Sequence, residues 1–121
     1  MKHILLIICF LAASVAPVLA FTGMDLSQQC SSAPESLGDT FCKTFVTAFT
    51  LGLGAVQNQA YAEHKTTMTC IPTGEGGATM DQIRLIVEKF MRDNPQILNK
   101  PADVIMFVAI NKAFPCPVSN Q

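Results

Sequence analysis

The amino-acid sequence predicts an all-α domain, a small helical bundle of three main helices and a short first helix, stapled by disulfide bonds. Three observations support this fold class. Apolar residues recur at three- and four-residue spacing in three separate segments, as they do on one face of a helix. No stretch of useful length alternates apolar and polar residues, as a half-buried strand would. Four cysteines follow the first twenty residues, an even number suited to disulfide bonds.

The first twenty residues have the three parts of a secretory signal peptide. Lys2 precedes an apolar run over residues 4–13, and small side chains lead to a cleavage site after Ala20. The run is shorter than the roughly 20 residues that a helix needs to cross a bilayer, although an uncleaved anchor is the alternative. We therefore expect a signal peptide at residues 1–20, a helical domain at residues 21–121 and a location in the bacterial periplasm.

Composition narrows the class of partner. The chain has 121 residues, of which 50% are hydrophobic and 14% charged, with a formal net charge of -1. These values leave no basic patch for a nucleic acid, and they differ from those of a disordered chain. The mean hydropathy of +0.35 suggests a membrane protein, but the apolar excess is concentrated in the signal segment. We therefore expect no nucleic-acid partner and no membrane contact after the signal is removed.

The pattern next predicts a short helix over residues 24–31 and a long helix from about Ser36. The apolar face of the long helix consists of residues at helical spacing: Leu37, Phe41, Phe45, Ala48, Phe49, Gly52, Val56 and Ala60. Gly52 and Gly54 weaken the middle of this helix by about 1 kcal/mol each relative to alanine. They indicate a bend, a close contact with another helix or a tolerated irregularity.

Residues 64–78 are predicted to form a loop, because they contain several threonines, Pro72 and three glycines. The stretch Gly74–Gly77 lacks the lysine of a phosphate-binding loop, so we interpret it as a flexible turn. Long loops in compact domains often carry function, which makes this loop a candidate contact surface.

Two further helices follow the loop. Thr79 and Gln82 form a capping-box pattern that opens the first of them, and Asn94–Pro95 ends it. Its apolar face consists of Ile83, Ile86, Val87, Phe90 and Met91. The last helix begins near Pro101, a favoured first helical position, and ends before residues 114–117. Its apolar face consists of Ala102, Ile105, Met106, Ala109, Ile110 and Ala113.

The cysteines of the exported chain are Cys30, Cys42, Cys70 and Cys116. An even number in an exported domain of this size indicates a disulfide framework, for which four cysteines allow three pairings. None of them stands in the close pairs typical of zinc ligands, so we expect no metal. If consecutive helices pack antiparallel, the layout favours Cys30–Cys42 and Cys70–Cys116 over the other pairings.

The sequence contains little that indicates catalysis. His64 is the only histidine after the signal segment and lies in a polar loop. No serine has the G-x-S-x-G context of a nucleophile elbow. We therefore expect no catalytic residue and no cofactor, which leaves a protein that acts by binding.

The order of the motifs resembles the Rap/Tai family of periplasmic immunity proteins. The motifs that carry the resemblance are Cys30, Phe41–Cys42, Cys70–Pro72, Thr79-x-x-Gln82, Asn94–Pro95, Pro101–Ala102 and Ala113–Cys116. The family tends to show glycines where Thr44 and Ala48 stand. The resemblance implies a small exported helical protein that binds a cognate amidase effector of a type VI secretion system. It also implies that this chain blocks the active site of the amidase, an enzyme that cuts peptidoglycan, and that the chain forms a homodimer.

An amidase inhibitor has to fill a cleft, and the loop at residues 64–78 has the length and polarity for this role. The expected contact residues are His64, Lys65, Thr66, Thr67 and Glu75. A surface loop without a partner is the alternative for this segment. For the whole chain the alternative is a periplasmic acid-stress chaperone, because such chaperones are also small, helical and disulfide-linked.

Overall fold

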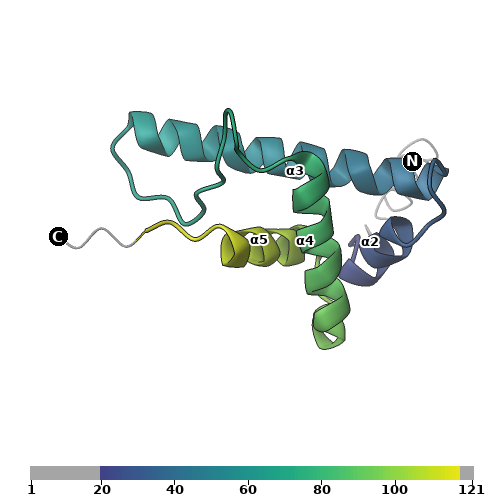
Figure 1. Cartoon of the computed structure of the whole chain (residues 1–121). Helices are drawn as coiled ribbons and strands as arrows, with labels where there is room; N and C mark the ends of the chain where they lie inside the picture. Colours follow the sequence, from purple (N-terminus) through teal and green to yellow (C-terminus); the bar gives the residue numbers. More distant parts are fainter. Residues whose placement is uncertain (1–19, 118–121) are drawn as a thin grey trace, which may run out of the picture.

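The computed structural model describes residues 20–117 of the chain (Figure 1). The elements in chain order are α2 (Gly23–Cys30), α3 (Leu37–Ala62), α4 (Met80–Asp93), the 3-10 turn η1 (Pro95–Ile97) and α5 (Ala102–Ala113). Extended pairing within these residues is limited to two isolated bridges, Thr22–Pro101 and Thr69–Pro115. The all-α fold class is therefore confirmed. The expected signal peptide at residues 1–20 lies, apart from Ala20, outside the described part of the chain.

Polar side chains define where the helices begin. The Thr79 hydroxyl accepts a hydrogen bond from the Gln82 N–H at 3.2 Å, and the Gln82 side chain accepts one from the Thr79 N–H at 2.9 Å. This capping box was predicted, whereas an equivalent pair at the start of α2 was not. There Thr22 and Asp25 exchange the same two bonds. Ser36 caps α3 through the N–H of Asp39 at 3.2 Å.

The long helix α3 continues without a break past its two glycines. A Cβ atom added to Gly52 or Gly54 would meet no other atom within 4 Å. They are therefore tolerated irregularities rather than sites of close helix packing. The helix ends where His64 adopts a positive φ of 53°, which lets the Lys65 N–H donate to the Ala60 carbonyl at 2.8 Å. This left-handed position is usually occupied by glycine.

The core lies where the four helices meet. Its largest fully buried side chains are Leu26, Val46, Ile83, Val87, Met91, Ile105, Met106 and Ile110. Figure 1 shows α3 along one side of the molecule, α5 beneath it, and α4 crossing both steeply. The antiparallel packing expected between α4 and α5 is therefore wrong, because α4 crosses α5 instead of running back along it.

Both favoured disulfide pairings are confirmed. Cys30–Cys42 joins the end of α2 to the first turns of α3. Cys70–Cys116 joins the loop between α3 and α4 to the segment after α5. The second pair meets because the loop itself comes down to the end of α5, as Figure 1 shows, and does not depend on antiparallel helices.

A charge cluster links α3 to α4. Asp39 is only 4% exposed, and its carboxylate accepts hydrogen bonds from Lys43 Nζ at 2.7 Å and from Arg84 Nη1 of the guanidinium group at 3.0 Å. The hydrogen bond from Lys43, followed by that from the Glu35 backbone N–H, holds the pKa of Asp39 below its usual value. Arg84 Nε also lies 2.9 Å from Glu88 Oε1, an ion pair without hydrogen-bond alignment.

Candidate functional site

The loop between α3 and α4 is fixed at its centre and exposed on both sides of it. Cys70 forms the disulfide with Cys116, and its N–H donates to the Phe114 carbonyl at 2.9 Å. The Thr69 hydroxyl donates to Asn111 Oδ1 at 3.3 Å. The centre of the loop is therefore tied to α5 and to the segment that follows it.

A second attachment comes from α3. The side chain of Gln57 accepts a hydrogen bond from the Ile71 N–H at 2.9 Å and donates one to the Ile71 carbonyl at 3.3 Å. It thus satisfies both backbone groups of Ile71, as a neighbouring strand would, while the Ile71 side chain is buried. Residues 69–71, which we call the clamp, are held between α3 and the end of α5.

The first arm of the loop, residues 64–68, contains four of the five predicted contact residues. His64, Lys65 and Thr66 are exposed, whereas Thr67 is half-buried and its hydroxyl donates to the Thr69 carbonyl at 3.2 Å. Met68 is also exposed, and sequence reasoning did not single it out. Lys65 pairs with Glu63 and, together with the Gln59 amide, lowers the pKa of that carboxyl.

The second arm, residues 72–77, presents the fifth predicted residue, Glu75, at an exposed turn. The Gly77 N–H donates to the Gly74 carbonyl at 3.0 Å. Gly74 and Gly76 have φ values of 84° and 80°, in the region that favours glycine. A Cβ on Gly77 would lie 2.7 Å from the Pro72 carbonyl oxygen. The predicted turn is therefore hydrogen-bonded, and its backbone favours glycine at all three positions. The clamp separates Glu75 from the four predicted contact residues of the first arm.

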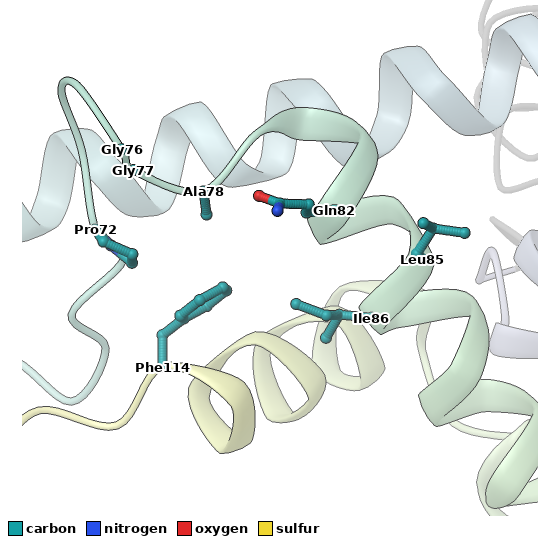
Figure 2. Close-up of a pocket in the computed structure, with 8 residues that line it drawn as sticks. All are labelled: Pro72, Gly76, Gly77, Ala78, Gln82, Leu85, Ile86 and Phe114. Atoms are coloured by element: carbon teal, nitrogen blue, oxygen red, sulfur yellow. The ribbon is translucent and has the colours of Figure 1, made fainter.

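Two hollows flank the second arm. One of about 470 Å³ is lined by Pro72, Gly76, Gly77, Ala78, Gln82, Leu85, Ile86 and Phe114 (Figure 2). The other, of about 440 Å³, is lined by Thr50, Leu51, Gly54, Ala55, Asn58, Ile71, Pro72, Thr73, Gly74, Ala78 and Met80. Sequence reasoning missed both hollows, because periodicity assigned Ile86 to a core face and gave Phe114 only the role of a helix end.

The outer side of α3 is a third exposed surface. Only Asp39 and Lys43 are charged among its 26 residues, so the helix is uncharged almost all round. Its exposed side has apolar or small residues at alternating four- and three-residue spacing: Leu37, Phe41, Thr44, Ala48, Leu51 and Ala55. The Phe41 ring lies 5.4 Å from that of Phe21 and 6.0 Å from that of Phe45. We call this surface the α3 stripe.

One group of metal-ligating residue types occurs within residues 20–117. The sulfurs of Cys30 and Cys42 and a carboxylate oxygen of Glu88 lie within 4.8 Å of one another. The two sulfurs are bonded to each other, so they are not thiolate ligands. The group is a covalent cross-link beside a carboxylate. No helix of the described part is both long and apolar enough to cross a membrane.

Comparison with known proteins identifies the family. The model of the Rap1a immunity proteins matches residues 22–116, which include all four helices, both disulfides and the whole loop. No curated protein and no solved structure matches the chain. Immunity proteins of this kind act by binding a cognate effector, and the match does not favour the chaperone alternative. The chain belongs to the family of Rap1a immunity proteins.

Proposed function

We propose that this chain is a periplasmic immunity protein that binds a peptidoglycan amidase delivered by a type VI secretion system and blocks its active site. The domain at residues 21–121 does so after export and removal of a signal peptide at residues 1–20. Membership of the Rap1a family supports the immunity role. Blocking requires no chemistry from the inhibitor, only a shape that enters the cleft and excludes substrate.

The observation that carries this proposal is the clamped loop. Its centre is held by the Cys70–Cys116 disulfide and by the two hydrogen bonds from Gln57, while both arms are exposed. A loop that is already ordered before binding loses less conformational entropy when it enters a cleft. The exposed residues His64, Lys65, Thr66 and Glu75 make the contact in this proposal, with Thr67 supporting the first arm.

A growth assay tests the proposed function. Candidate type VI amidases directed to the periplasm of a host bacterium should stop growth, and co-expression of this chain should restore growth against its cognate amidase. Restoration of growth by a version of the chain confined to the cytoplasm would contradict the proposal. Failure of the exported chain to restore growth against any amidase of a panel would also contradict it.

Paired variants test the loop as the contact. The double variant Lys65→Ala/Glu75→Ala changes one exposed residue on each arm and leaves the clamp intact. It should weaken binding to an inactive form of the cognate amidase by at least about tenfold, since centrally placed contacts dominate binding energy. The matched control Lys100→Ala/Asp103→Ala removes the same two charge types elsewhere on the surface and should bind as the wild type does. Equal weakening by both variants would argue against the loop.

We also propose that the protein is a homodimer that pairs through the α3 stripe. The stripe exposes large apolar side chains such as Leu37 and Leu51 to solvent, and its alternating spacing is that of helices that pack side by side. Leu51 is 62% exposed on this surface. Leu51→Lys should convert a dimer to a monomer in analytical ultracentrifugation, whereas Val104→Lys, at a position 48% exposed on α5, should not. A monomeric wild type at high protein concentration would refute this proposal.

A further inference from the structure

The hollow between the second arm, α4 and Phe114 has apolar walls. Figure 2 shows the Pro72 ring, the Phe114 ring and the Ile86 side chain around the open space. Its volume of about 470 Å³ falls within the range of about 300–1,000 Å³ for ligand pockets. The hollow is therefore large enough to take a bulky side chain from another molecule.

The backbone around the hollow is held in place. The Phe114 N–H donates to the Ile110 carbonyl at 2.9 Å, and the Phe114 carbonyl accepts the bond from Cys70. The Ala78 N–H donates to the Pro72 carbonyl at 3.0 Å across the glycine turn. The walls thus exist before any partner arrives, which lowers the entropy lost on binding.

One polar group lies at the edge of the hollow. The Oε1 atom of Gln82 is held by the Thr79 N–H at 2.9 Å, which fixes the orientation of the side-chain amide. Its Nε2 group has no hydrogen-bond acceptor within residues 20–117, and Figure 2 shows the amide beside the open space. This group is placed to donate to a main-chain carbonyl of a bound segment.

The exposed charges that flank the hollow are negative, because Arg84, which adjoins the lining residue Leu85, is half-buried and pairs with Asp39 and Glu88. Between residues 66 and 83 the chain has two acidic residues, Glu75 and Asp81, and no basic residue. Both are exposed, and each adjoins a residue that lines the hollow, Gly76 and Gln82 respectively. No lining residue is charged, so a complementary partner presents an apolar side chain for the walls and a cation for the rim.

We propose that this hollow docks a bulky apolar side chain of the effector that is flanked by lysine or arginine, with Gln82 Nε2 donating to its main-chain carbonyl. The proposal rests on the proposed function for the identity of the partner. Its chemistry is tested on the free protein, so the two can fail separately.

The probes are three acetylated and amidated tripeptides: Lys-Phe-Lys, Lys-Ala-Lys and Glu-Phe-Glu. In two-dimensional NMR spectra of the folded, oxidised protein, Lys-Phe-Lys should shift the Gln82 side-chain amide and the Ala78 backbone amide. The other two peptides should bind at least about tenfold more weakly, because one lacks the apolar group and the other repels the rim. Ala78→Leu fills the hollow and should abolish the shifts, whereas Asn58→Leu, at an exposed position that lines only the other hollow, should preserve them.

Four outcomes would overturn the inference. The first is equal binding of Lys-Phe-Lys and Lys-Ala-Lys, and the second is shifts confined to the α3 stripe. The third is a dependence of the hollow's amide signals on protein concentration alone, which would assign the site to a second copy. The fourth is a change of these signals in a chain ending at Pro117, which would assign it to the chain's own last residues. Growth protection without peptide binding would leave the proposed function standing and remove only the docking site.

Discussion

Removing the disulfide that anchors the loop should have a large and localised effect. The variant Cys70→Ala/Cys116→Ala opens a bridge between residues separated by 46 positions. The loop-closure entropy of a bridge of that span corresponds to about 4 kcal/mol of unfolding free energy. For a domain of about 100 residues this lowers the melting temperature by about 20 °C. Because small domains have about 5–15 kcal/mol of stability, the helices should persist at room temperature.

Two measurements on the oxidised proteins check this expectation. Far-UV circular dichroism gives the melting temperature, and hydrogen exchange reports on the Ile71 amide, whose hydrogen bond to Gln57 depends on the clamp. The control Cys30→Ala/Cys42→Ala removes a bridge between residues 12 positions apart, which contributes about 3 kcal/mol to the unfolding free energy. This control should leave the Ile71 amide protected. A fall in melting temperature of less than about 5 °C, with Ile71 still protected after removal of the long bridge, would refute the reasoning.

Three further predictions concern the helical frame and are read from chemical denaturation. Gly52→Ala should raise the unfolding free energy by about 1 kcal/mol, whereas Gly77→Ala should lower it, because a Cβ there lies 2.7 Å from a carbonyl oxygen. Met106→Ala empties a fully buried position and should cost about 2–5 kcal/mol, against less than about 1 kcal/mol for the half-exposed Val108→Ala. The lowered pKa of Asp39 gives stability that is fully present above its unfolded value of 3.8 and is lost as pH falls through the folded value. Asp39→Asn should therefore reduce the loss of unfolding free energy at acid pH. An unchanged loss would show that this carboxylate does not cause it.

The elements of the fold follow from local signals, and the sequence therefore predicts them well. Thr79 with Gln82 opens α4 through bonds three residues apart, and Asn94–Pro95 ends it because proline disfavours a helical residue before it. The direction of α4 across α5 has no such local signal. It depends on how whole helix faces pack, and the short connection through η1 does not by itself determine the angle.

The candidate site is less predictable for the same reason. Polarity and glycines locate the loop, yet its order depends on Gln57, whose side chain bonds a backbone 14 residues away. Nothing in the local sequence distinguishes that glutamine from its neighbours on an exposed helix. Likewise Phe114 lines a hollow only because the loop returns beside it, which is a consequence of tertiary structure.

The position of the clamp at the centre of the loop has a consequence for how the two arms respond to substitution. Residues 69–71 separate the first arm from the second, and Gln57, Asn111 and the disulfide to Cys116 hold them to the helical frame. An insertion or substitution in one arm is therefore not transmitted to the other. The two arms are separable modules, so under the proposed function the contact with the effector can change in one of them while the other keeps its shape.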